Sequence, residues 1–346
     1  MPLIITNPIQ KYPVNRPLES SEREHQLDQK KPTPGTTEPK SSVIRMNSTF
    51  LELPDGHFAV RGALTFAWLF IAGAGIFLPL FFLFRFVNDP DVSDYQKGEV
   101  TLVLLLICGV VALILVIYHF TSRYSLRREL FRYTHYPIRF NRKTRKVYCF
   151  RSDGTVMTED WNKLFFFICG YTTYIATSRS ISSVNHKELR FHCLSKDRRT
   201  VLETFMLLQG ATASDSFLLP QWEFVRQFME KGPQKLNDQV QFVHDISGHR
   251  EKFGVLWRLY MSANPGRKAM ITLSPVFFPV FFLFRICRWM AMRTCMVPVW
   301  PAEIEAECRV DPDDLYICGE VAESALRSHC PASHRQNRAP SGTDPA

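Results

Sequence analysis

The sequence predicts an α+β membrane protein, in which a transmembrane helical hairpin precedes a strand-rich domain. Two uncharged apolar runs predict the hairpin: residues 62–84 and 100–120 contain no Asp, Glu, Lys or Arg. A bilayer core about 30 Å thick needs roughly 20 apolar residues in a helix, and both runs meet that length. Between residues 136 and 208, short runs of alternating apolar and polar residues are typical of strands.

The segment before the hairpin is polar. Residues 1–45 are rich in Pro, Ser, Thr, Lys and Glu and contain few aromatic residues. Such a segment buries too little apolar surface to offset the chain entropy lost on folding, so we expect it to be disordered. The hairpin unit then occupies residues 46–124. Because the first apolar run follows a long polar segment, we interpret it as an uncleaved anchor and not as a signal peptide.

Charges on either side of the two runs predict the orientation of the hairpin. Basic residues near transmembrane ends stay in the cytoplasm. Residues 86–99 between the runs carry four acidic residues and one lysine, whereas the second run is followed by nine basic residues opposed by Glu129 alone: Arg123, Arg127, Arg128, Arg132, Arg139, Arg142, Lys143, Arg145 and Lys146. We therefore expect both flanks in the cytoplasm.

The first four arginines of this group, Arg123, Arg127, Arg128 and Arg132, are the residues that we expect to contact the membrane surface. Nucleic-acid binding is the alternative for a basic cluster. We prefer the anionic lipid bilayer as the partner, because the cluster adjoins a membrane segment.

Residues 125–232 form the predicted cytoplasmic β-domain. Six or seven short strands are separated by turns such as Asn141–Thr144 and Ser152–Thr155. One helix follows, with Pro220 in its first turn and with Trp222, Val225, Phe228 and Met229 on one face. An antiparallel sheet closed by one amphipathic helix predicts a PH-like domain.

The remainder, residues 233–326, is mixed and contains a third apolar run at residues 270–284. This run is short for a span and is basic on both sides, so we expect a re-entrant or interfacial segment on the cytoplasmic face. A tilted third span and a soluble core element are the alternatives. Residues 327–346 are expected to be a disordered tail.

Composition points away from catalysis and transport. The chain has a net charge of +9 and a mean hydropathy of −0.10, which fits two spans plus a soluble portion. No nucleotide-binding, zinc-protease or hydrolase motif occurs, and neither span carries the charge that a transport path needs. The nine cysteines include no C-x-x-C pair, so we expect reduced thiols. We therefore expect no catalytic, cofactor-binding or metal-binding residues, no cofactor and no nucleic acid.

Several segments resemble one family of bacterial membrane proteins. They are Tyr136-Pro-Ile-Arg-Phe-Asn, the helix that begins at Trp222, Arg288-Trp-Met-Ala-Met-Arg-Thr, Val297-Pro-Val-Trp-Pro, Glu303-Ile-Glu and Cys308. Together they resemble DUF6708, over roughly residues 50–320. The resemblance implies a membrane hairpin before a strand-rich domain. It also implies proteins encoded near type VI secretion effectors, where they look like immunity or accessory factors.

These observations lead to one preferred function and two alternatives. We expect a multi-pass bacterial inner-membrane protein, with cytoplasmic N- and C-terminal regions, that acts by binding another protein, a toxin or a secretion component. A membrane-anchored lipid-sensing or regulatory module is the first alternative, and an effector enzyme with an unrecognised site is the second. The partner-binding residues and the oligomeric state are not predicted.

Overall fold

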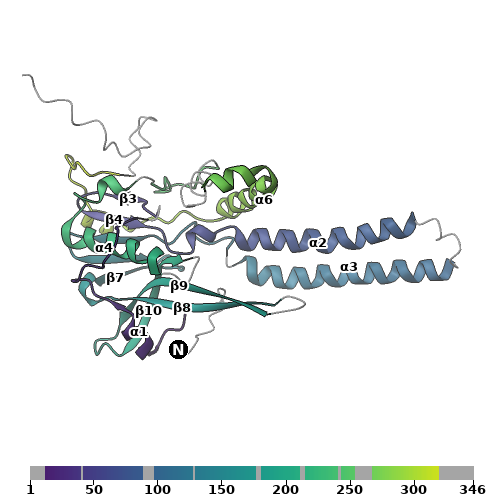
Figure 1. Ribbon diagram of the computed structural model, residues 1–346, viewed down its shortest axis with the longest axis horizontal. Coiled ribbons are helices and arrows are strands. Elements are labelled where there is room, and N and C mark those ends of the chain that lie inside the picture. The colour runs from purple at the N-terminus through teal and green to yellow at the C-terminus, as the bar shows by residue number, and fades with distance from the viewer. Residues whose placement is uncertain are drawn as a thin grey trace, which may run out of the picture.

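The computed structural model describes residues 12–39, 42–88, 97–127, 129–176, 181–210, 215–240, 243–253 and 267–318. It consists of a strand-rich domain from which a long helical hairpin projects (Figure 1). The fold is therefore a mixed α+β arrangement, as the alternation of apolar runs and strand patterns predicts.

Two antiparallel sheets of five strands each form the domain. The first sheet has the order β1-β10-β9-β8-β2, with strands Arg16–Pro17, Thr200–Gly210, Ile181–Leu194, Phe165–Ala176 and Gln26–Leu27. The second has the order β3-β4-β5-β6-β7, with strands Arg45–Met46, Phe50–Leu53, Ile138–Asn141, Lys146–Phe150 and Val156–Asp160.

The main hydrophobic core lies between these sheets and helix α4, Leu219–Lys231. Trp161 and Trp222 stack at its centre with ring centroids 5.9 Å apart, and both side chains are buried. α4 forms where the apolar spacing predicts a helix, and it ends at Gly232, whose φ of 86° suits a residue without Cβ. The shorter helix α7, Ala302–Glu307, packs through Ile304 on the outer face of the second sheet.

The helical hairpin is inserted between two neighbouring strands of the second sheet. β4 pairs with β5 from Phe50 opposite Asn141 to Leu53 opposite Ile138. The hairpin helices α2, Ala63–Val87, and α3, Lys97–Leu126, lie between these strands in the chain. Because both ends of the insertion are held in one sheet, the domain fixes where the hairpin starts and where it returns.

The N-terminal part of the chain differs from the prediction of disorder for residues 1–45. Residues 12–38, which we call the clasp, contribute β1, helix α1 at Ser20–Glu24, and β2 to the first sheet. Tyr12 and Leu18 of the clasp are buried against the sheet. The clasp folds because the domain supplies the apolar surface that the segment lacks by itself.

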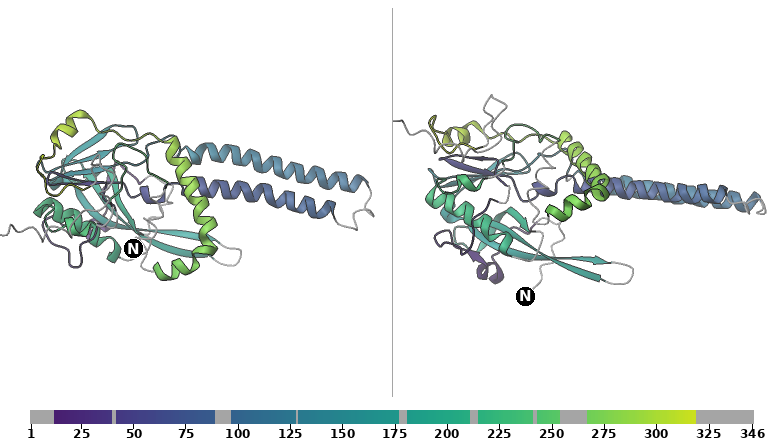
Figure 2. Two further views of the ribbon diagram at one scale, coloured as in Figure 1. Left: turned by 90° about the horizontal axis from the view of Figure 1, so that it is seen from above. Right: turned by 45° about the horizontal axis from the view of Figure 1, so that its top comes forward.

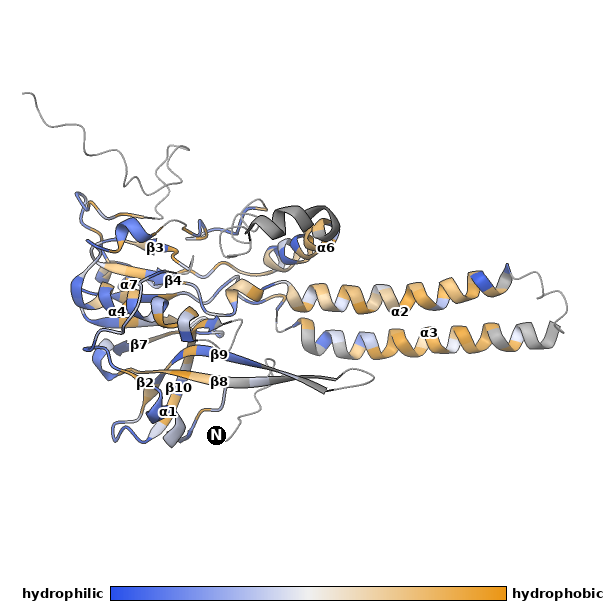
Figure 3. Ribbon diagram, viewed as in Figure 1, coloured by the Kyte–Doolittle hydropathy of each residue, from blue (hydrophilic) through white to orange (hydrophobic). Residues whose placement is uncertain are grey.

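The described residues of the two hairpin helices are mostly apolar, as the hydropathy colouring shows (Figure 3), and many of their large apolar side chains are exposed. Phe82 of α2 is 64% exposed and Leu105 of α3 is 66% exposed. By length and composition, one helix in the described part of the chain qualifies as a membrane span, at Phe58–Phe86 and with none of its apolar window buried. In α3 the apolar stretch is shorter, Leu104–Phe120.

The third apolar run belongs to a longer helix than the sequence predicts. α6 spans Arg267–Thr294 as one continuous helix and runs across the base of the hairpin (Figure 2). Phe284 of α6 contacts Phe66 of α2, with ring centroids 5.8 Å apart. The run at 270–284 is therefore the first part of a crosswise helix whose second part packs on the domain.

Candidate functional site

The base of the hairpin is the first candidate site, because α2, α3 and α6 meet the domain there. Glu129, just beyond α3, is buried with its carboxylate at the start of α2. The main-chain N–H and the hydroxyl of Thr65 donate to its Oε2 at 2.7 and 2.6 Å, and the Gly62 N–H donates to its Oε1. Glu129 therefore caps α2 by binding helix N–H groups that have no partner within the helix.

A close backbone approach fixes α6 against α2. Gly62, the residue before α2, has a φ of 92°, and a Cβ placed on it would lie 2.5 Å from Arg288 Cα. The buried Arg288 guanidinium donates to the carbonyl oxygens of Phe58 and Arg61 at 2.8 and 3.1 Å and pairs with Glu251 at 2.8 Å. These contacts bind the end of the domain, the start of α2 and the middle of α6 into one joint.

Two buried histidines flank the residue that enters this joint. The Phe58 ring lies 5.9 Å from the His135 ring and 5.1 Å from the His244 ring, centroid to centroid. Burial, together with the positive charge of Arg61 and the proximity of His244, lowers the pKa of His135 to about 3. His135 is therefore neutral at physiological pH and serves packing beneath α2.

The face of α6 that points away from the domain is apolar and exposed. Between residues 278 and 294, Cys287, Arg288, Ala291 and Met292 are buried, whereas the exposed large apolar side chains are Phe278, Val280, Phe282, Leu283, Trp289 and Met290. The Arg293 guanidinium lies 5.2 Å from the centroid of the Trp289 ring. An exposed apolar face that carries Trp and Arg suits a boundary between water and an apolar phase.

The predicted membrane-surface arginines lie next to this joint in the chain. Arg123 in the last turn of α3, Arg127 and Arg132 are exposed, and the Arg132 Nε donates to the Arg127 carbonyl oxygen at 3.2 Å. Arg128 lies outside the described residues. Contact between these side chains and lipid stays a prediction.

The other five basic residues after the second run are held within the domain. Arg139 is fully buried and pairs with Glu52 at 2.8 Å and with Glu305 at 3.0 Å. Arg142 donates to the Ser48 carbonyl oxygen, and Lys143 forms an ion pair with Asp311. Arg145 pairs with Glu230, and Lys146 pairs with Glu307. Folding therefore buries Arg139 and gives the other four basic residues partners in the domain, while Lys143 stays exposed.

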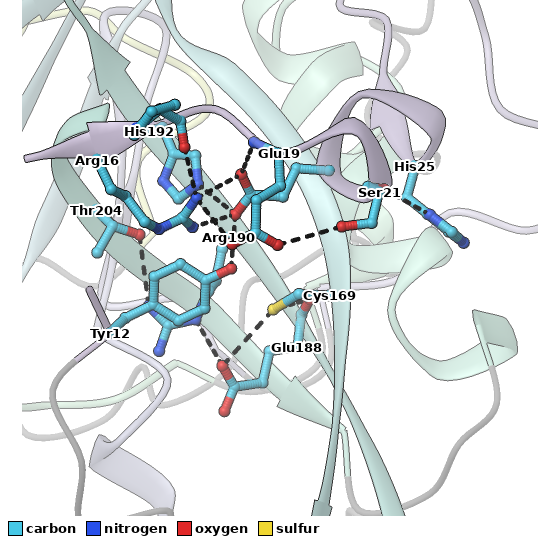
Figure 4. Close-up of polar contacts among 12 residues, drawn as sticks. Tyr12, Arg16, Glu19, Ser21, His25, Cys169, Glu188, Arg190, His192 and Thr204 are labelled. Atoms are coloured by element: carbon cyan, nitrogen blue, oxygen red, sulfur yellow. Dashed lines mark hydrogen bonds and ion pairs between the residues drawn. The ribbon is translucent and has the colours of Figure 1, made fainter. Parts of the chain in front are cut away.

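A second candidate site lies where the clasp meets the first sheet (Figure 4). Its centre is the buried carboxylate of Glu22, which accepts hydrogen bonds from Tyr12 Oη at 2.8 Å, from Arg16, and from His192 Nε2 at 3.2 Å. The Tyr12 ring also lies under the Arg190 guanidinium, 4.4 Å from its centroid. Three clasp residues and two residues of β9 thus form one buried polar cluster.

Burial and hydrogen bonding set the protonation state of this cluster. Burial alone would raise the pKa of Glu22, but hydrogen bonds from His192, Arg16, the Glu19 N–H and Tyr12 hold that pKa well below its usual range. Burial lowers the pKa of His192 and raises that of Tyr12. The cluster is therefore a charged carboxylate held by Arg16, with a neutral histidine and phenol.

Sequence reasoning did not identify Glu129 or Glu22 as site residues. A helix cap is ordinarily sought beside its own helix in the sequence, whereas Glu129 caps a helix that begins more than sixty positions earlier. Glu22 lies in a segment whose composition indicates disorder. Neither residue has a local signal, because each acquires its role from a contact distant in sequence.

The described part of the chain contains both free and disulfide-bonded cysteines. Seven cysteines there are free, namely Cys108, Cys149, Cys169, Cys193, Cys287, Cys295 and Cys308. Cys318 differs from the prediction of reduced thiols, because it is disulfide-bonded. Within the described residues, no group of three or more His, Cys, Asp or Glu side chains is placed to hold a metal ion.

Comparison with known proteins gives one match. A model described as a family of unknown function, DUF6708, matches residues 112–312. No curated protein and no solved structure matches the chain. The matched range contains β5 to β10, α4, α6 and α7, and it confirms the resemblance over these residues. Because it covers more than half of the 346 residues, the chain belongs to the DUF6708 family.

Proposed function

We propose that this protein is a membrane-anchored binding protein whose hairpin crosses a bilayer and whose two-sheet domain binds a partner at the membrane surface. The exposed apolar surface of the projecting hairpin supports this proposal. Large side chains such as Phe70, Phe77, Phe82 and Leu105 are each at least 60% exposed. A patch of this extent is costly in water and marks a surface that another apolar phase covers.

The dimensions of the hairpin fit a bilayer. α2 has 25 residues, which at a rise of about 1.5 Å per residue gives roughly 37 Å, more than the hydrocarbon core of about 30 Å. With α2 and α3 across the membrane, the crosswise α6 lies along its surface with its apolar face inward. This arrangement supports the expected interfacial segment at residues 270–284 over the alternative of a tilted third span.

The anchoring proposal is tested by charge insertion. Leu105→Arg places a cation on the exposed face of α3, and we expect the protein to become extractable from membranes by alkaline carbonate. Leu202→Arg is the matched control, because Leu202 is exposed on β10 of the domain. Equal extraction of both variants and of the unaltered protein would refute the anchor.

Orientation is tested by reporter fusions. A reporter after Asp94 should be active only in a periplasmic form, and one after Gly232 only in a cytoplasmic form, if the domain is cytoplasmic as the charges predict. The reverse pattern would place the domain outside and would overturn the proposed inner-membrane topology.

The finer proposal concerns the domain and its partner. The order β4 to β7, then β8 to β10, then the closing α4 is the arrangement that supports a PH-like domain. The resemblance to bacterial proteins beside type VI secretion toxins supports an immunity or accessory role through occlusion of a toxin. Co-expression with a toxin encoded beside this gene should restore growth, whereas toxicity of the chain by itself would indicate an effector enzyme.

Exposed arginines favour a second candidate, a lipid-sensing or regulatory module. Arg123, Arg127 and Arg132 lie at the end of α3 that joins the domain. Lipid attraction through them should weaken steeply between low salt and high salt, because surface charges are screened. A domain–partner interaction that persists at high salt supports protein binding instead.

A further inference from the structure

The clasp reaches both edges of the first sheet and crosses its outer face. β1 pairs with β10 through Arg16 and Val201, and β2 pairs with β8 through Leu27 and Phe166. α1 lies between the two short strands in the chain, and the side chains beneath the clasp form a cluster separate from the main core. The chain thus places one of its own extended segments at both edges and on the outer face of this sheet.

The surface beneath the clasp is apolar. Tyr12 and Leu18 pack on Phe165, Phe167 and Val201, and all five are buried. Phe166 and Phe191 of the same strands face the main core. The outer face therefore requires a cover, and an occupant with an aromatic and an aliphatic side chain satisfies it.

The second half of the clasp is held by main-chain and polar contacts. Gln29 Nε2 donates to the carbonyl oxygens of Trp161 and Leu164 at 2.8 and 2.9 Å, and the Thr33 N–H donates to Glu223 at 2.9 Å. Most side chains from residues 28 to 38 are exposed. Segments of many different sequences can form contacts of this kind, because the carbonyl oxygens and the Glu223 carboxylate of the domain bind backbone and polar atoms.

The edge of β8 can pair with more chain than the clasp supplies. β8 spans Phe165–Ala176, but β2 pairs with Phe166 and Phe167 alone, and the Ile168 N–H donates to the His25 carbonyl oxygen at 3.3 Å. No other strand of the described residues pairs along this edge. Exposed sheet edges bind extended segments by strand addition.

The polar cluster supplies the chemical specificity. Glu22 is the carboxylate that the clasp brings to the outer face, and from the sheet His192 Nε2 donates to it at 3.2 Å. Arg16 and Tyr12, which also donate to Glu22, belong to the clasp itself. His192 is fully buried, and its Nδ1 has no hydrogen-bond partner in the described part of the chain. The sheet therefore offers one nitrogen that binds the carboxylate of the occupant and a second buried nitrogen that another occupant can bind.

We propose that the outer face of β8 to β10, with the edge of β8, is the partner-docking surface and that the clasp is its resident occupant. The partner is a protein with an extended segment that carries a carboxylate to His192, lays an aromatic ring under Arg190, and adds a strand to β8. This inference rests on the proposed binding function and is independent of the hairpin crossing a membrane.

A peptide with the sequence of residues 11–38 is the probe. Binding is followed by fluorescence anisotropy on the full chain in detergent micelles, so that failure of membrane anchoring does not affect the readout. The Glu22→Gln variant loosens the clasp, and we expect it to bind the peptide saturably and at least about tenfold more tightly than the unaltered chain, because a buried charged hydrogen bond is lost. Glu24→Gln, which changes an exposed carboxylate of the same helix, should bind like the unaltered chain.

The peptide itself supplies the second control. A peptide with Gln in place of Glu22 should bind the loosened chain at least about tenfold more weakly. Equal binding of the two peptides, or no binding by a loosened chain that stays folded, would overturn the proposal. A stable dimer of the Glu22→Gln variant that excludes the peptide would assign the surface to a second copy and would also overturn it.

Hydrogen exchange keeps the proposal testable in the unaltered chain. The Asn15 and Leu18 N–H groups donate to the Val201 and Arg199 carbonyl oxygens, each at 2.7 Å. If the clasp opens by itself, these amides exchange at least about tenfold faster than those of the β9–β10 ladder. Equal protection would show that the clasp is a permanent part of the sheet and would refute its role as a replaceable occupant.

Discussion

The hairpin and the domain use the same residue types in opposite ways. Phe, Leu and Val fill both, yet Phe82 of α2 is 64% exposed whereas Phe166 of β8 is fully buried. The domain buries its apolar side chains internally, whereas the hairpin leaves them exposed. The difference shows that the same residue types form a packed core in one region and an apolar surface in the other.

The largest effect is expected from a substitution in the core of the domain. Trp222→Ala leaves a cavity beside Trp161, and the free energy of unfolding of the domain should fall by about 3–5 kcal/mol. Phe82→Ala removes a comparable ring from the exposed surface of α2 and should leave that free energy nearly unchanged. Thermal unfolding in detergent micelles, followed by near-ultraviolet circular dichroism, measures both; equal losses would contradict the division between the two regions.

The next effect lies at the joint itself. Glu129→Ala leaves the N–H groups of Gly62 and Thr65 buried without their acceptor, so the free energy of unfolding should fall by about 2–3 kcal/mol. Hydrogen exchange at these two amides should increase in the variant. Glu159→Ala on β7, a half-buried carboxylate in the domain, is the control and should leave those amides unchanged.

Two glycines, one just before α2 and one within it, compare a packed position with an open one. Gly62→Ala forces a Cβ towards Arg288 Cα at a positive φ, and we expect a loss of about 1–3 kcal/mol and looser packing of α6. Gly73→Ala has nothing within 4 Å of the added Cβ and should be neutral or slightly stabilising. A crosslink between cysteines placed on α2 and α6 reports the packing, and its persistence in Gly62→Ala would argue against a fixed joint.

The smallest expected effect is a dependence on pH. Because the pKa of His135 is lowered to about 3 in the folded protein, the unfolded state binds more protons below about pH 6.5. Stability is therefore complete above that pH and is lost as the pH falls towards 3, by about 1.4 kcal/mol at pH 5.5 relative to pH 8.

The variant His135→Asn should flatten this part of the curve, measured by thermal unfolding across the pH range. His25→Asn removes an exposed histidine of the clasp and serves as the control. If both variants lose as much stability at acid pH as the unaltered protein, the buried histidine is not the source of that loss.

Much of the architecture is predictable from local patterns. The uncharged runs at 62–84 and 100–120 lie within the region of α2 and α3, and alternating residues mark parts of β5 to β10. β8, β9 and β10 are longer than the short strands that the sequence predicts. The helix predicted from Trp222, Val225 and Phe228 is α4. These elements carry their own periodicity, so the sequence alone predicts them.

Other elements have no local signal. β1, β2 and β3 have two residues each, too few to show a period, and they exist because neighbouring strands offer them hydrogen-bond partners. α6 continues beyond residue 284 through Arg285 and Arg288, which ended the apolar run in the sequence. Arg288 is tolerated there because its guanidinium is bound by carbonyl oxygens and Glu251.

The sequence by itself therefore determined the apolar hairpin, the strand-rich domain and the closing helix, because hydropathy and periodicity act over neighbouring residues. Only the tertiary structure decided that the polar N-terminal segment is a clasp, that Glu129 caps α2, and that Arg139 is buried beside Glu52. Each of these depends on partners far apart in the sequence, such as Glu22 with His192. A buried charge takes its role from the partner that the fold brings to it.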